Sequence, residues 1–216
     1  MSLDRWWSSV RRYDAGVLTM TSVALTIALL AVYAVAVRTS AGQRWDVAAF
    51  GDVSPLHDVA AGPASMLRDT APLLLAVVAV ALGALAVRRG RWRAALAGAL
   101  ASWASLVGAT VMRDVVLERP MLGGHGYVQN TLPSGHVAVV TALTLAVLLL
   151  WPGPTPPRWA VLGGAGVVVA VAGASVVTYA HRPSDVVAGC LVGLLATVLA
   201  CWLVRVPLAP LGPGAA

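Results

Sequence analysis

The sequence predicts an all-α protein, a polytopic membrane bundle of six transmembrane helices, from three observations. Hydrophobic residues make up 59% of the 216 residues, charged residues 11%, and the mean hydropathy is +0.82. A soluble domain carries about 25% charge, so this chain has too few charged residues to cover a water-facing surface. Six stretches meet the length of roughly 20 mostly apolar residues that a bilayer requires; they are residues 16–37, 71–87, 94–112, 134–151, 159–179 and 184–204.

We expect these stretches to form one membrane domain over residues 1–216. The first stretch follows Arg11 and Arg12, as the apolar region of a signal peptide would, but it exceeds the usual length of about 7–15 residues and is taken as a span. The segment from Arg38 to Thr70 is expected to be an outer loop. Its Ser54-Pro55 pair is a helix-start signal, which favours a short interfacial helix or lid.

The later spans are joined inside by the short connections RRGRWR and PGPTPPR. Small residues recur in these spans, which predicts tight packing between helices; they are Gly163, Gly164, Gly166, Gly189 and Gly193. Cys190 and Cys201 lie in one apolar run, so we interpret them as packing residues rather than a disulfide or metal pair.

The charges predict the orientation. One set of span ends carries nine arginines against two aspartates, a balance of +7; the arginines are Arg5, Arg11, Arg12, Arg88, Arg89, Arg91, Arg93, Arg158 and Arg205. The other ends carry six arginines against seven acidic residues, a balance of −1. Basic residues concentrate on the cytoplasmic side of membrane proteins, so both termini are expected inside. The net charge of +6 therefore marks topology and gives no reason to expect a nucleic-acid partner.

Three polar clusters fall at span ends on the predicted outer side: RDVVLERP from Arg113, LPSGH from Leu132 and HRPSD from His181. In LPSGH, proline is favoured at the first helical position, so Pro133 is expected to begin the fourth span. The amides of Ser134, Gly135 and His136 would then be unpaired and could bind an anion, with His136 as a proton donor. A simple helix cap with an interfacial histidine is the alternative.

In HRPSD, Pro183 is expected to begin the sixth span, with His181 and Asp185 one turn apart. A carboxylate near a histidine fixes its tautomer and makes the other nitrogen a better nucleophile. The alternative is a polar helix start in which Asp185 offsets the helix dipole. Arg119, and Arg113 before it, could clamp an oxyanion or could anchor the chain at the interface.

The remaining histidines, His57 and His125, have no partner that the sequence identifies, and we expect them to be structural or incidental. Four histidines dispersed over separate segments lack the spacing of metal ligands, so no metal site is expected.

The three clusters resemble the motifs of the type 2 phosphatidic acid phosphatase family of membrane lipid phosphatases, which are Lys-x6-Arg-Pro, Pro-Ser-Gly-His and Ser-Arg-x5-His-x3-Asp. Arg119-Pro120 matches the end of the first motif, Pro133 to His136 match the second, and His181 to Asp185 match the end of the third. The six spans, the motif order and the spacing agree with the family.

The chain departs from the family at two positions. Met112 stands where the first motif has its lysine, although Arg113 is adjacent, and Ser175 stands where the third motif has its arginine. We hypothesise that Arg182, next to the expected nucleophile, supplies the missing charge.

The resemblance implies a cofactor-free lipid phosphatase. His181 would attack phosphorus, Asp185 would orient the imidazole, and His136 would protonate the leaving oxygen. Arg119, Arg113 and Arg182, with the amides of Ser134 and Gly135, would hold the phosphoryl oxygens. The substrate would be a lipid phosphate of the outer leaflet, such as a polyprenyl diphosphate, phosphatidic acid or phosphatidylglycerophosphate, with a slight preference for the polyprenyl carrier. The sequence does not specify the oligomeric state.

Two other functions are compatible with parts of the sequence. The missing third-motif arginine would fit a family member that has lost turnover and binds lipid phosphates or a partner protein. A small transporter or channel subunit would need polar residues at mid-bilayer, and the spans offer only scattered serines and threonines there.

Overall fold

The computed structural model of the chain describes residues 15–122 and 129–206. These residues form six α-helices and two short π-helical segments, with no strand among them. The helices are α2 (Ala15–Val32), α3 (Ser40–Arg88), α4 (Trp92–Val111), α5 (Gly135–Leu149), α6 (Arg158–Val177) and α7 (Pro183–Val204). The π-helical segment Tyr33–Val37 continues α2, and Met112–Val116 continues α4. The predicted all-α fold is confirmed, and each expected span coincides with a helix or part of one.

Among the described residues, five helices are long and apolar enough to cross a membrane: α2, α3, α4, α6 and α7, with the π-helical extensions of α2 and α4. Helix α5 is equally apolar but has only 15 residues. The chain is therefore a multi-pass membrane protein by helix length and composition.

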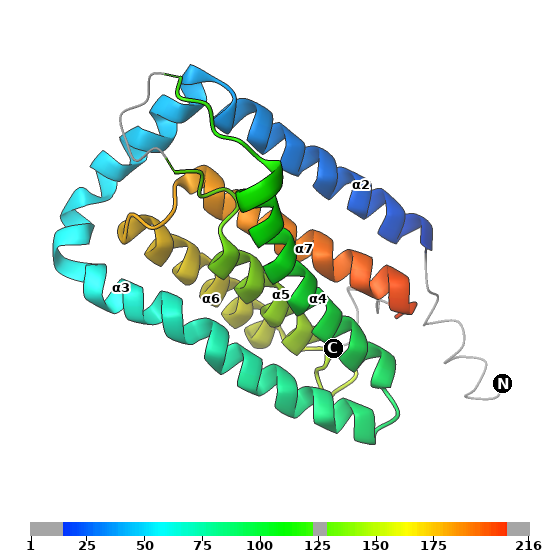
Figure 1. Cartoon of the computed structure of the whole chain (residues 1–216). Coiled ribbons are helices and arrows are strands. Elements are labelled where there is room, and N and C mark those ends of the chain that lie inside the picture. The colour runs from blue at the N-terminus through cyan, green and yellow to red at the C-terminus, as the bar shows by residue number, and fades with distance from the viewer. Residues whose placement is uncertain (1–14, 123–128, 207–216) are drawn as a thin grey trace.

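The expectation of an outer loop from Arg38 to Thr70 was wrong. This segment is helical and continues into the second span, so α3 runs for 49 residues, with the Thr39 hydroxyl accepting a hydrogen bond from Gly42 N at its start. Pro55 lies inside this helix with Pro63 and Pro72. A proline inside a helix removes one backbone hydrogen bond and bends the helix. Figure 1 shows α3 turning through a wide bend in its cyan part and then running along the bundle.

Helix α7 packs closely on α5 because two glycines face it. A Cβ atom at Gly189 would lie 2.6 Å from Ser134 O, and one at Gly193 would lie 2.5 Å from Ala138 O. No side chain fits at those distances, so the glycines allow the two backbones to approach. This confirms the predicted packing role of the pair. It also places the LPSGH segment directly against the start of α7.

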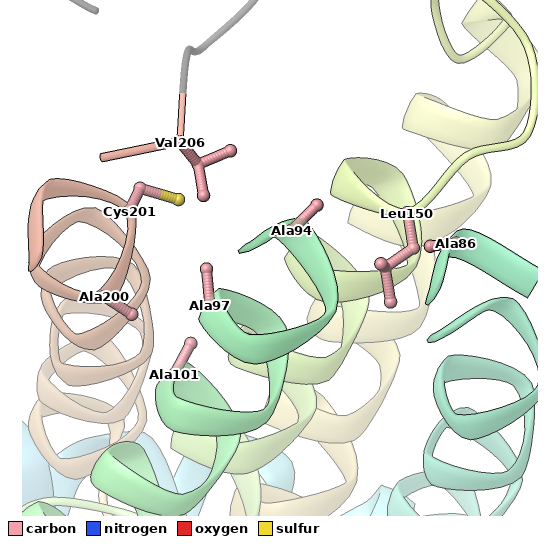
Figure 2. Close-up of a cluster of buried hydrophobic side chains, with 8 residues drawn as sticks. All are labelled: Ala86, Ala94, Ala97, Ala101, Leu150, Ala200, Cys201 and Val206. Atoms are coloured by element: carbon pink, nitrogen blue, oxygen red, sulfur yellow. The ribbon is translucent and has the colours of Figure 1, made fainter. Parts of the chain in front are cut away.

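The end of the bundle opposite this contact is closed by small apolar side chains. Figure 2 shows alanines of α4 facing Ala200 and Cys201 of α7, with Leu150 and Ala86 beside them. Cys201 is a free, buried thiol that packs in this cluster, as expected. At the same end, the Arg91 guanidinium donates to Leu149 O and Trp151 O at the end of α5 (both 2.8 Å). The arginine thus satisfies carbonyls that the helix leaves unpaired.

Candidate active site

The first and third polar clusters are joined by a buried ion pair. Arg119, from the segment after α4, donates from Nη2 to Asp185 Oδ1 of α7 at 2.8 Å. The Arg119 side chain is 5% exposed and that of Asp185 is fully buried. The second cluster joins the same point, because Ser134 N donates to the backbone oxygen of Asp185 at 2.9 Å. The structure therefore brings Arg119, Ser134 and Asp185 together around the start of α7.

His181 lies in the short connection between α6 and α7 and is 8% exposed. Its Nδ1 atom is 3.1 Å from Thr131 O and 3.9 Å from Asp185 Oδ2. A carbonyl oxygen only accepts hydrogen bonds, so the contact with Thr131 requires the proton on Nδ1. In the neutral imidazole this tautomer leaves the lone pair on Nε2, which is the form that a nucleophilic histidine needs.

The Asp185 carboxylate has several polar neighbours, and His181 is the most distant of them. Its Oδ2 atom accepts from the backbone N of Arg182 at 3.0 Å and from the hydroxyl of Thr131. The carboxylate thus fixes Thr131, whose carbonyl in turn holds the His181 ring. Both interpretations of Asp185 have a physical basis here, since the bond to Arg182 N is a helix-start contact and the Thr131 bond leads to the histidine.

Thr131 was not among the predicted site residues. Its carbonyl and its hydroxyl bind His181 and Asp185 respectively, and its hydroxyl also accepts from Arg182 Nη1 at 3.1 Å. A threonine preceding Leu-Pro carries no chemical signal of its own. Only its position two residues before the LPSGH proline could have drawn attention to it.

The start of α5 differs from the prediction. Pro133 precedes the helix, which begins at Gly135, and the Ser134 amide is paired with Asp185 O rather than free. The expected set of three unpaired amides was therefore wrong for Ser134. Its hydroxyl, however, is buried and has no hydrogen-bond partner within the described part of the chain. At Gly135 the space on the side where a Cβ atom would stand is open, because such an atom would meet nothing within 4 Å.

His136 stands in the first turn of α5 with 45% of its side chain exposed. Its Nε2 atom is 3.8 Å from Asp69 Oδ1 of α3. Asp69 is held by Arg68 Nε at 3.2 Å, and Arg68 Nη1 donates to Thr178 Oγ1 of the loop before His181 at 3.2 Å. An accessible histidine beside a carboxylate is suited to proton transfer.

Two further residues from α3 reach the site, and neither was predicted. Asp46 is fully buried; its carboxylate accepts from Ser184 N (3.0 Å), Ser184 Oγ (2.5 Å) and Arg119 Nη1 (3.4 Å). One turn earlier, Gln43 Nε2 donates to Pro120 O at 2.6 Å, and Gln43 Oε1 accepts from Leu122 N at 3.3 Å. In the sequence these residues fell in the expected outer loop, where a lone aspartate is indistinguishable from a surface charge.

The other expected phosphate ligands occupy different places. Arg182 is 4% exposed and donates to Gln129 O at 3.4 Å as well as to Thr131, so its guanidinium lies beside the His181 network. Arg113 instead pairs with Asp114, from Nε to Oδ1 at 2.7 Å. Ser175, at the position of the missing arginine, is fully buried and donates to Val171 O within α6.

His57 has a structural contact, as its ring stacks on Tyr179 with centroids 4.2 Å apart and its Nδ1 lies 2.8 Å from Val177 O. His125 lies outside the described residues. Within residues 15–122 and 129–206, His, Cys, Asp and Glu side chains form no group of three that could hold a metal ion.

The order and convergence of these motifs agree with a comparison against protein families. Residues 114–207 match the model of the PAP2 superfamily. The match confirms the resemblance to the type 2 phosphatidic acid phosphatases, and it contains Arg119, the PSGH segment and the His181–Asp185 segment. No curated protein and no solved structure matches the chain. Gln43 and Asp46 lie outside the PAP2 match, in the part of the chain that precedes it.

Proposed function

We propose that the protein is an integral membrane lipid phosphatase that hydrolyses a phosphate monoester or diphosphate of a lipid through a phosphohistidine at His181. The observation that carries this proposal is the geometry at His181. In the neutral ring, donation from Nδ1 to Thr131 O leaves the lone pair of Nε2 available, and Asp185, 3.9 Å from Nδ1, is paired with the buried Arg119. All of these residues lie within the PAP2 match. Members of the PAP2 superfamily are typically phosphatases, and the apolar helices agree with a substrate that stays in the bilayer.

Unpaired polar atoms at the site support binding of an oxyanion. Arg119 Nε and Ser134 Oγ are buried and have no partner among the residues that the structure describes. Leaving such an atom unsatisfied costs about 1–3 kcal/mol, which a ligand able to accept both hydrogen bonds would recover. A phosphoryl group has the oxygen atoms to do so.

The proposed reaction has two steps. His181 Nε2 attacks the terminal phosphorus while the bond from that phosphorus to the leaving oxygen breaks, and His136 gives its proton to that oxygen. The leaving oxygen is the lipid oxygen of a monoester or the bridging oxygen of a diphosphate, so the other product is the lipid alcohol or the lipid monophosphate. Water then attacks the phosphohistidine, His136 takes the water proton, and phosphate leaves. Arg119 and Arg182 stabilise the charge on the phosphoryl oxygens, which is usually a large contribution.

We further propose that the site lies on the extracytoplasmic side of the cell membrane. A lipid of the outer leaflet could then keep its tail in the bilayer while its phosphate reaches His181. A polyprenyl diphosphate, phosphatidic acid and phosphatidylglycerophosphate all satisfy this requirement, with a slight preference for the polyprenyl carrier.

A second candidate function is a lipid-phosphate binding protein with impaired turnover. Ser175 is buried, bonded within its own helix, and uncharged where the family has an arginine, so one phosphate clamp is missing. Such a protein would bind lipid phosphates at the same residues without releasing phosphate.

Phosphate release by purified protein from a panel of lipid phosphates, with a chelator present, separates the two functions. We expect turnover of at least one lipid, because arginines rather than a metal stabilise the charge in this mechanism, and we expect none in His181→Ala. Binding of the same lipids without any turnover would support the second candidate and contradict the first.

The Arg182 hypothesis has its own test. Arg182→Ala should raise KM or lower kcat for the preferred lipid by about tenfold or more if Arg182 replaces the missing clamp. Unchanged turnover and affinity in this variant would remove Arg182 from the phosphate site.

A further inference from the structure

Asp46 is a buried carboxylate that has no role in the reaction proposed above. It is fully buried in α3, and its three hydrogen-bond donors come from Arg119 and from Ser184 at the start of α7. Burying a carboxylate costs free energy unless it is paired and hydrogen-bonded. The contacts with Arg119 and Ser184 therefore stabilise Asp46 at its buried position.

Arg119 is consequently held from two directions. Its Nη1 atom faces Asp46 Oδ2 at 3.4 Å and its Nη2 atom faces Asp185 Oδ1 at 2.8 Å. These two contacts fix the plane of the guanidinium group and leave Nε without a partner among the described residues. A guanidinium group that is fixed before the substrate binds loses little freedom when it stabilises developing charge.

Gln43 extends the same arrangement to the backbone. It binds Pro120 O and Leu122 N, the residues that follow Arg119, and it lies three residues before Asp46 on the same helical face. The first turns of α3 therefore hold both the side chain and the backbone of the Arg119 segment.

We infer that Asp46 is a positioning residue for Arg119, supplied by a part of the chain outside the PAP2 match. This inference rests on the proposed phosphatase function. Asp46 does not touch the substrate in this account. It orients Arg119 for the transition state, and its negative charge also opposes tight retention of the phosphate product.

If Asp46 positions Arg119, removing its charge should lower turnover without weakening the binding of phosphate. Asp46→Asn retains the shape of the side chain but removes its charge, so Arg119 loses one of its two anchors while an anion meets less repulsion. We expect kcat to fall about tenfold or more, and the inhibition constant of inorganic phosphate to stay equal to that of the parent or decrease. Asp52→Asn, an exposed aspartate on the same helix, is the matched control and should leave both quantities unchanged.

A purely structural role gives a different result. It would reduce the yield of folded protein but leave kcat per folded molecule and the phosphate inhibition constant within about twofold of the parent, and that result would overturn the inference. If Asp46→Asn does not fold, Asp46→Glu takes its place. It keeps the charge but displaces the carboxylate from Arg119, and we expect kcat to fall here too; parental kcat in a folded Asp46→Glu protein would count against the inference.

A double-variant cycle tests whether Asp46 acts through Arg119. In an Arg119→Lys background, Asp46→Asn should lower kcat by less than about threefold, because the guanidinium group that Asp46 orients is already gone. A tenfold fall in both backgrounds would show independent action and contradict the inference. If the parent itself turns over no lipid phosphate, the proposed function fails. The inference is then judged by calorimetry with inorganic phosphate, where Asp46→Asn should bind at least as tightly as the parent and weaker binding would overturn it.

Discussion

In a direct histidine–aspartate pair, one carboxylate both fixes the tautomer of the histidine and supplies negative charge. Around His181 these two functions belong to two residues, Thr131 and Asp185. The Nδ1 proton goes to the backbone oxygen of Thr131 at 3.1 Å, while Asp185 is 3.9 Å away and binds the Thr131 hydroxyl. The backbone carbonyl fixes the tautomer, and the carboxylate supplies nearby negative charge for the imidazolium ion that forms during attack. Asp185 thereby affects His181 mainly through Thr131 and through the electric field.

The two histidines can be distinguished by the leaving group. A general acid matters most when the departing oxygen is a poor leaving group, so His136→Ala should impair hydrolysis of a lipid monoester severely and of an activated aryl phosphate much less. His181→Ala should abolish both activities, because no covalent intermediate can form. Initial rates on the two substrates measure this, and a His136 variant equally inactive on both would contradict the assigned roles.

Asp185→Asn should reduce turnover more than a helix cap alone would explain. The change leaves Arg119 paired only with Asp46 and removes the charge near His181, so we expect phosphate release to fall by roughly 10²–10³. The folded fraction, measured by size-exclusion chromatography, should remain close to that of Asp58→Asn, an exposed aspartate used as the control. Activity within about twofold of the parent would mean that the carboxylate serves only as a helix cap.

At the scale of helices, the contact between α5 and α7 determines whether the second and third motifs meet. Gly189 faces Ser134, the residue whose amide binds Asp185 O, so the distance between these helices sets the geometry of the site. The two helices can come this close because glycine has no side chain at the contact.

Gly189→Ala should therefore damage both stability and activity. Its new Cβ atom would lie 2.6 Å from Ser134 O, a backbone atom that cannot rotate away, and we expect a loss of about 1–3 kcal/mol in stability. Turnover should fall as well, because the new Cβ atom pushes α5 and α7 apart and moves Ser134 away from Asp185. Gly173→Ala in α6 is the control, since a Cβ atom there meets nothing within 4 Å. Thermal unfolding in detergent and phosphate release measure the two effects, and equal behaviour of the two variants would contradict this account.

The helices themselves were predictable because their signal is local. Apolar length located all six, and Pro183 marks the first residue of α7 as expected. Helix α3 was predicted only in part, since Pro55 and the polar residues near it favour a loop, whereas the structure accommodates three prolines in one bent helix. Tertiary packing decides that outcome, and no local signal encodes it.

The site was predictable where its chemistry is carried by motif residues. Arg119, Ser134, His181 and Asp185 do come together. The contributions of Asp46 and Thr131 depend on which groups they face after folding, and a single aspartate or threonine has no spacing pattern that would reveal such partners. Arg113 is a residue that the motif predicts at the phosphate site but that has another partner in the structure. Its guanidinium group pairs with the neighbouring Asp114.

For the whole molecule, the two ends of the bundle differ in charge. The connections between α3 and α4 and between α5 and α6, together with the end of α7, carry basic residues, and the polar site lies at the opposite end. Figure 1 shows the beginning of α2 and the end of α7 at the same end as the connection between α3 and α4. If arginine bias sets the topology, this end is cytoplasmic.

Topology can be measured without any activity. A reporter that is active only outside the cytoplasm should be silent when fused after Ala216 and active when inserted near Gly124, in the segment between the first and second motifs. The opposite pattern would place the site in the cytoplasm and exclude a lipid of the outer leaflet as the substrate.

Detection of the covalent intermediate tests the proposed mechanism most directly. The purified parent is mixed with its preferred lipid phosphate carrying labelled phosphorus, quenched in alkali within the first turnover, and digested for mass spectrometry. We predict a phosphoryl group on His181 that is stable in alkali and lost in acid, as a phosphorus–nitrogen bond should be, and no labelled peptide from His181→Ala. Turnover by the parent with no labelled histidine, or with the label on a residue other than His181, would contradict the assignment of His181 as the nucleophile.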